Sequence, residues 1–219
     1  MPPLYSQILN LLAALMLILA FAMLSQRRIL SLIHLFTLQG LTVACATALV
    51  AHVTRQPELY YSAALTLALK VFLIPWLLHR LIQRLRVQWD VETLINIPGL
   101  MLVGIVLVII AFNLAAPIAP LAISVARGSL GIALACLLLS FMMMITRAKA
   151  VPQVIGFLAM ENALFFAATS ATYGMPMMVE LGIALDVLVG MLILGVFLFQ
   201  IREQFDSLDI RHLEKLKED

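Results

Sequence analysis

The chain has 219 residues, of which 63% are hydrophobic and only 12% are charged, and its formal net charge is +2. Ordinary soluble domains carry about a quarter charged residues, so this composition excludes a soluble globular domain and predicts an all-α, polytopic membrane helix bundle. The basic residues occur in short clusters between apolar runs and form no continuous basic face, which excludes a nucleic-acid-binding protein.

Seven apolar stretches follow one another along the chain, each long enough to cross about 30 Å of hydrocarbon. We expect transmembrane helices at residues 4–24, 29–53, 59–82, 94–114, 129–145, 152–173 and 178–201. The first stretch has no basic residue before it and no small-residue cleavage site leading into a soluble domain. We therefore interpret it as a membrane span and not as a signal peptide.

The loop charges predict how the chain is oriented. Eleven Arg and Lys residues fall in loops on one side, whereas only Arg55 and Arg127 fall on the other. The positive-inside rule therefore places the amino terminus outside the cytoplasm and the carboxyl terminus within it. The tail, residues 204–219, is amphipathic. Either a short helix against a partner or the membrane surface, or a solvated tail, fits that pattern.

An internal repeat emerges when the sequence is shifted by 122 residues, because the first three predicted spans then overlie the last three without gaps. The informative matches are polar: Arg27 on Lys149, Gln39 on Glu161, Glu58 on Glu180 and Arg80 on Arg202. An extra crossing between the copies gives both the same orientation, as in the parallel repeats of many transporters. We predict a first three-helix repeat at 1–86, a connecting fourth helix with its loops at 87–126, and a second repeat at 127–203.

Acidic residues interrupt the last two predicted spans. Glu161, followed by Asn162, lies about 13 Å into its span, and Asp186 lies at a comparable depth in the next one. Glu180 falls near the outer interface. A carboxylate in hydrocarbon costs between roughly 2.5 and 10 kcal/mol, so such groups usually face a bundle interior and often mark ion or proton paths. Because a short loop joins these two spans, we expect Glu161 and Asp186 on neighbouring helices.

Lys70 lies in the middle of the third span, and His34 and Gln39 extend the polar row from the second. Pro75 leaves the Val71 carbonyl without its usual helical donor, which predicts a deformable spot beside the lysine. Two interpretations are open. The residues form a lateral proton path, or they form ion pairs and interhelical hydrogen bonds that only fix helix packing. For His34 and Gln39 the hydrogen-bond interpretation is favoured, and Glu180 can simply extend to the interface.

Cys45 and Cys136 fall in separate spans without metal-ligand spacing, so we interpret both as small core residues. The sequence contains no nucleotide-binding loop and no nucleophile triad, which predicts that the chain has no catalytic site of its own.

Three segments carry a family resemblance: TRAKAVPQVIGFLAMEN at 146–162, VELGIALDVLVG at 179–190 and LDIRHLEKLK at 208–217. Over its whole length the chain resembles hydrogenase-4 component E, a membrane subunit of group 4 NiFe-hydrogenase and formate hydrogenlyase complexes. Its last three predicted helices also resemble the small K-type subunit of complex I and the related C-type subunit of multisubunit Mrp Na+/H+ antiporters.

In this K/C-type family, two intramembrane glutamates serve proton transfer. Asp186, with Gly190 four residues later, matches the second of these. The first would fall at Leu158, whereas Glu161 stands three residues later, nearly one turn along the same helical face. The resemblance therefore implies a proton relay through Glu161 and Asp186, to which Lys70 and Glu180 are added by their positions.

The resemblance implies a multi-pass subunit of the bacterial inner membrane, beside antiporter-like and quinone-site-like subunits. It also implies a peripheral hydrogenase arm whose Fe–S clusters and Ni–Fe site belong to partner chains, with no cofactor on this one. We expect a role in redox-coupled proton translocation. An assembly subunit, a member of an Mrp-type antiporter and a stand-alone small-molecule transporter are the alternatives, and either H+ or Na+ fits as the coupled ion.

Overall fold

The computed structural model describes residues 4–85, 96–117 and 127–172, together with Gly182, Val189 and Gly190. Its elements are helices: α1 (Leu4–Ser25), α2 (Ile29–Thr54), α3 (Pro57–Thr66), the π-helical η1 (Leu67–Leu73), α4 (Ile74–Leu85), α5 (Ile97–Ala115), α6 (Arg127–Thr146) and α7 (Ala150–Thr172). The segments α3, η1 and α4 follow one another without a break, so that Pro57–Gln83 forms one membrane-length helix.

Six helices within the described residues are long and apolar enough to cross a membrane. They begin and end within three residues of the first six predicted spans, which confirms an all-α, multi-pass membrane protein. The predicted seventh span at 178–201 lies outside the described residues except at Gly182, Val189 and Gly190, and the predicted tail at 204–219 lies outside them entirely.

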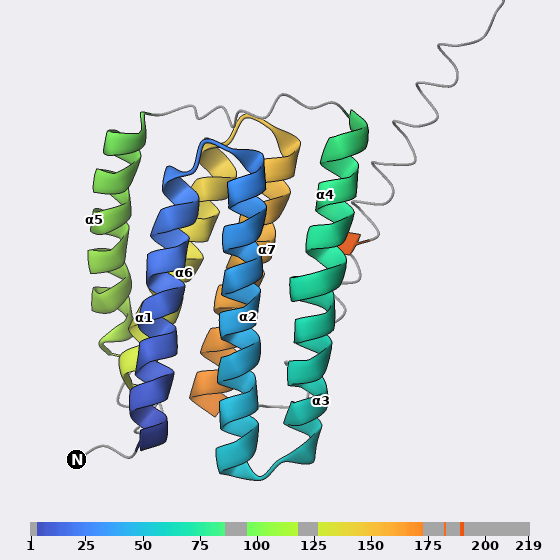
Figure 1. Cartoon of the computed structure of the whole chain (residues 1–219). Coiled ribbons are helices and arrows are strands. Elements are labelled where there is room, and N and C mark those ends of the chain that lie inside the picture. The colour runs from blue at the N-terminus through green and yellow to red at the C-terminus, as the bar shows by residue number, and fades with distance from the viewer. Residues whose placement is uncertain (1–3, 86–95, 118–126, 173–181, 183–188, 191–219) are drawn as a thin grey trace, which may run out of the picture.

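Among the helices that the structure describes, four form the centre of the bundle. The helix α1 packs against α2 and α6, and α7 packs against α6 and α2. On one flank α5 covers α6 and α1, and on the other the α3–η1–α4 helix covers α2 (Figure 1). The 122-residue shift aligns the sequence of α1 with that of α6 and the sequence of α2 with that of α7. Each of these two pairs of helices is also in contact in the bundle.

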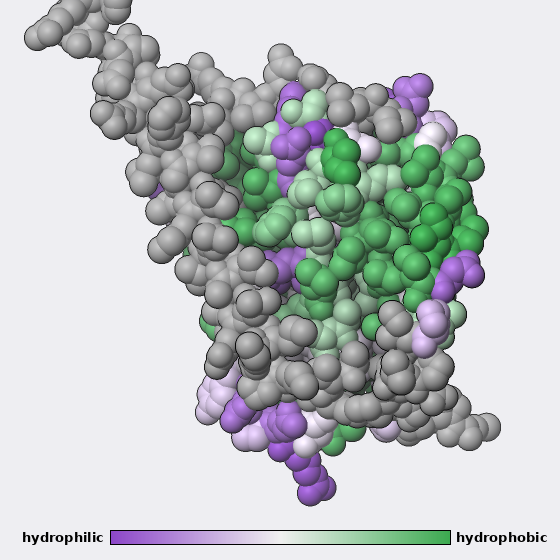
Figure 2. Space-filling model, turned by 180° about the vertical axis from the view of Figure 1, so that it is seen from behind, coloured by the Kyte–Doolittle hydropathy of each residue, from purple (hydrophilic) through white to green (hydrophobic). Residues whose placement is uncertain are grey.

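The outer surface between the helix ends is apolar. Ile18, Phe72, Leu102 and Ile105 are each more than half exposed, which in water would be an aggregation-prone surface and in a bilayer is the lipid-facing side. Figure 2 shows hydrophobic residues over most of the described part of one face, with hydrophilic ones mainly toward its upper and lower ends. The middle of the bundle therefore has the apolar surface expected of a protein surrounded by lipid chains.

The third span changes its helical period at mid-length. The backbone N–H of Ile74 donates to the carbonyl of Leu69, five residues back, which is the π-helical spacing. Directly afterwards comes Pro75, which has no N–H to donate. The deformation predicted next to Lys70 thus takes the form of a π-helical segment, and Lys70 lies inside it.

Candidate functional site

A buried ion pair joins the third span to α7. Lys70 Nζ donates to Glu161 Oε1 at 2.9 Å, and the two side chains are only 2% and 3% exposed. Lys70 is the central residue of the 27-residue helix Pro57–Gln83, and Glu161 is the central residue of the 23-residue α7. The two charges therefore meet halfway along their helices, at the level expected for the middle of the bilayer.

The geometry around Lys70 depends on a close helix approach. On α2, a Cβ built on Gly40 would lie 3.0 Å from Lys70 Cβ and 3.5 Å from its carbonyl oxygen. Because glycine has no side chain, the backbones of α2 and η1 lie almost in contact there. The aromatic ring of Phe165 on α7 lies 5.8 Å from Lys70 Nζ, within the range of a cation–π interaction.

Next to the ion pair lies a pair of amides. Asn162 Nδ2 donates to Gln39 Oε1 at 3.3 Å, and both side chains are completely buried. Among the described residues, Gln39 Nε2 and Asn162 Oδ1 have no hydrogen-bond partner. Since Asn162 follows Glu161 in sequence, and Gln39 precedes the glycine that touches Lys70, the four residues form one unit. We call Lys70, Glu161, Gln39 and Asn162 the central polar cluster.

The central polar cluster brings together residues from α2, η1 and α7. Its ion pair is neutral as a whole, which lowers the cost of holding charge in a low-dielectric interior. Separating Lys70 from Glu161 would leave two uncompensated buried charges, which is strongly unfavourable in a low-dielectric interior. The cluster can therefore act either as a proton-exchanging pair or as a fixed tie between helices.

The structure brings four of the predicted site residues together: Lys70, Glu161, Gln39 and Asn162. It does not bring His34 to them. His34 is exposed on the outer face of α2, five residues from the buried Gln39 and therefore about 140° around the helix. The predicted row of polar groups along α2 thus ends at Gln39.

Two predicted relay acids, Glu180 and Asp186, lie outside the described residues. Gly182 lies between them in sequence and is buried. A Cβ built on Gly182 would lie 3.0 Å from the ring of Phe165 and 3.8 Å from Glu161 Oε1. The chain after α7 therefore passes directly beside Glu161 at this residue.

One buried arginine was not predicted from the sequence, where Arg147 counts only among the loop charges. The structure leaves it 1% exposed between α6 and α7, where Nη2 donates to the carbonyls of Met23 at 3.0 Å and Leu24 at 2.9 Å. These carbonyls belong to the last turn of α1, where intrahelical donors run out, and the Met23 carbonyl also accepts the backbone N–H of Gln26 at 3.3 Å. Nothing in the sequence distinguishes Arg147 from the nearby Lys149 as the buried residue, so no local signal predicted this contact.

Within the part of the chain that the structure describes, no three His, Cys, Asp or Glu side chains come together as metal ligands. The groups that the central polar cluster does offer are an amine, a carboxylate and two amides, which exchange protons and form hydrogen bonds.

No protein-family model and no solved structure matches the chain. It is 31% identical over 204 residues to the Mycobacterium tuberculosis (strain ATCC 25618 / H37Rv) protein named "Uncharacterized protein Rv0085", covering 92% of this chain and 93% of that protein. Because the similarity extends over nearly the whole of both proteins, the chain belongs to the same family as mycobacterial Rv0085.

Proposed function

We propose that this chain is a membrane subunit of a complex I-like group 4 NiFe-hydrogenase or formate hydrogenlyase complex and that it contributes to redox-coupled proton translocation. The observation that carries the proposal is the Lys70–Glu161 ion pair, buried at 2.9 Å at the centre of two membrane-length helices. Intramembrane ionisable pairs of this kind are typical of proton relays. The resemblance of 146–162, 179–190 and 208–217 to hydrogenase-4 component E supplies the setting.

In the proposed mechanism, opening of the ion pair drives proton exchange. When the pair separates, the Lys70 ammonium gives a proton to one side and becomes a neutral amine, while the Glu161 carboxylate takes a proton from the other side and becomes a neutral acid. When the pair re-forms, the Glu161 acid passes its proton to the Lys70 amine at the 2.9 Å contact, which restores the ion pair, so each cycle moves one proton from the side that supplied Glu161 to the side that received the proton of Lys70. Asp186 and Glu180 serve as further relay acids in this proposal.

The loop charges support a membrane orientation for the chain, and the resemblance suggests its partner subunits. The turns after α1 and α6 and the end of α4 lie at one end of the bundle (Figure 1), and Arg27, Arg28, Arg80 and Lys149 occur there. By the positive-inside rule that end faces the cytoplasm and the amino terminus faces the periplasm. Antiporter-like and quinone-site-like subunits would be the membrane partners, and a peripheral arm would hold the Fe–S clusters and the Ni–Fe site.

The same contact favours a second candidate function, that of a structural subunit in the same assembly. Lys70 and Glu161 are closed into a direct pair at 2.9 Å, and a closed buried pair holds α7 against the third span. Breaking such a pair by removing one partner usually costs about 3–5 kcal/mol, which suits a packing role equally well.

Conservative substitutions distinguish the two functions. Glu161→Gln and Asp186→Asn keep the size of each side chain and its hydrogen bonding but remove the titratable group. We expect each to lower proton pumping per electron transferred, measured by dye quenching in inverted vesicles, while the complex still co-purifies. As a control, Glu58→Gln changes an exposed acid in the first turn of α3 and should leave pumping unchanged. Full pumping in Glu161→Gln with an intact complex would exclude the relay.

A paired substitution sharpens the comparison. Lys70→Met together with Glu161→Met removes both charges and leaves none uncompensated. A purely structural pair predicts that the double variant regains assembly and pumping compared with Lys70→Met alone. The relay predicts that assembly returns while pumping stays low, because neither remaining side chain exchanges a proton.

A further inference from the structure

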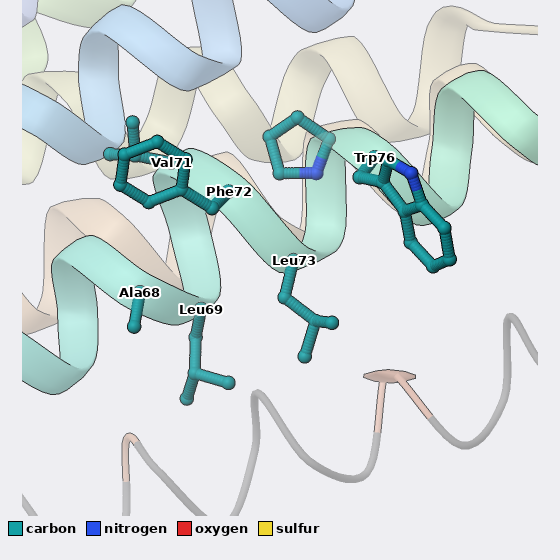
Figure 3. Close-up of a pocket in the computed structure, with 7 residues that line it drawn as sticks. Ala68, Leu69, Val71, Phe72, Leu73 and Trp76 are labelled. Carbon is teal, nitrogen blue, oxygen red and sulfur yellow. The ribbon is translucent and has the colours of Figure 1, made fainter.

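An apolar groove of about 630 Å³ runs along the outer side of η1 and the start of α4. The described residues that line it include Ala68, Leu69, Phe72, Leu73, Pro75 and Trp76. Figure 3 shows Leu69, Leu73 and Trp76 projecting from the same side of the helix. Phe72, Leu73 and Trp76 are 65%, 45% and 55% exposed, so the groove opens toward the lipid. The buried Lys70 faces inward from the same segment.

The positively charged side chain of Arg80 lies at the cytoplasmic end of the groove. The guanidinium carbon of Arg80 lies 5.1 Å from the ring centre of Trp76, within the range of a cation–π interaction. Trp76 therefore both lines the groove and contacts Arg80. His79 and Arg80 are both exposed. Tryptophan and arginine next to each other at the end of a membrane helix are typical of the headgroup level of a bilayer.

The length of the groove limits what can fill it. Ala68 and Trp76 are eight residues apart, which at about 1.5 Å per residue corresponds to roughly 12 Å, well under half of the ~30 Å hydrocarbon thickness. Part of an acyl chain is apolar and short enough to fit.

We propose that this groove binds an acyl chain of an anionic phospholipid whose phosphate is held by Arg80. The occupant has to be apolar beside Leu69, Leu73 and Trp76 and negatively charged one turn later, and an anionic phospholipid combines both properties. Basic pockets on the cytoplasmic side of membrane helices commonly bind such headgroups. The groove lies outside the central polar cluster, so this binding site is independent of the proposed proton transfer.

Tryptophan fluorescence offers a direct test, because the chain has only two tryptophans, Trp76 and Trp89. The full-length Trp89→Phe variant reports on Trp76 alone when it is reconstituted in vesicles that contain lipids with brominated chains, which quench tryptophan on contact. We expect brominated phosphatidylglycerol to compete for Trp76 about five-fold better than brominated phosphatidylcholine, the effect of one arginine at an anionic headgroup.

Substitutions then locate the contact. In the same background Arg80→Gln should abolish the preference for phosphatidylglycerol, Arg80→Lys should keep most of it, and the control Arg27→Gln should keep all of it. Arg27 is exposed at the same end of the bundle but lies away from the groove lining. Ala68→Phe should reduce quenching by both lipids because it fills the groove. Equal quenching by the two lipids, a preference that persists in Arg80→Gln, or unchanged quenching in Ala68→Phe would each overturn the proposal.

Discussion

Gly40 lies so close to Lys70 that a Cβ built on the glycine would stand 3.0 Å from the Cβ of the lysine. The lysine atom is fixed to the backbone of η1 and cannot swing aside as the end of a long side chain would. The approach of α2 to the third span, and with it the position of Nζ opposite Glu161, therefore depends on the missing side chain at residue 40.

We predict that Gly40→Ala lowers the free energy of unfolding in detergent by about 1–3 kcal/mol, the usual cost of overpacking a close contact. The cost arises although alanine is the better helix former by about 1 kcal/mol. Gly190→Ala is the matched control, since none of the described atoms lies within 4 Å of a Cβ built there. A variant at residue 40 as stable as the one at residue 190 would show that η1 yields without strain.

We predict that the effects of substituting Lys70 and Glu161 on the free energy of unfolding are not additive. Lys70→Met should destabilise the bundle by about 3–5 kcal/mol because it leaves the Glu161 carboxylate buried without its counter-charge, and Glu161→Met should do the same to the lysine. The double methionine variant should recover most of the loss. Thermal unfolding of the four proteins in one detergent measures the coupling, and simple addition of the two single losses would contradict a direct interaction between the charges.

The helices could be read from the sequence because each apolar run is about as long as a bilayer is thick. Proline near the first position of α3 and α5 marks two of the starts. The π-helical period of η1 was not predictable, since every residue from Leu67 to Leu73 except Lys70 is apolar, and such a run fits either helical period. Only Pro75 indicated that something near Lys70 had to change.

The four members of the central polar cluster could be picked out from the sequence, but the pairing of Lys70 with Glu161 could not. Lys70 and Glu161 stood out because charges in apolar runs are rare, and the neighbour that chain proximity predicted for Glu161, Asp186, lies outside the described residues. The contact that the structure describes joins residues 91 positions apart. His34 could not be assigned to a face because α2 is apolar on all sides, and a helix of that kind carries no pattern that distinguishes inside from outside.

The amide pair gives a third prediction. Gln39→Leu removes the hydrogen bond that Asn162 Nδ2 donates, so we expect a loss of about 1–3 kcal/mol in the free energy of unfolding. Replacing both residues by leucine should cost less than that, because Gln39 Nε2 and Asn162 Oδ1 already lack partners among the described residues. Chemical unfolding of the single and double variants checks the order, and a double variant worse than either single one would mean that the amides serve the fold beyond their mutual bond.

Arg147 gives the last prediction. Arg147→Met should lower the free energy of unfolding by about 1–3 kcal/mol, since the carbonyls of Met23 and Leu24 lose the guanidinium that caps them inside the bundle. The control Arg27→Met removes an exposed arginine at the same end and should change stability by no more than about 0.5 kcal/mol.

The effect of Arg147→Met should not vary with pH between 6 and 9. Burial lowers the pKa of Arg147 to about 10, below that of the unfolded chain, so the arginine is charged in both states throughout this window. Above pH 10 the folded protein releases this proton before the unfolded chain does, and stability rises with pH only there. Unfolding midpoints of both proteins at pH 6, 7.5 and 9 test this, and a difference that changes across these values would mean that Arg147 loses its proton near neutrality and cannot be a permanent cap on α1.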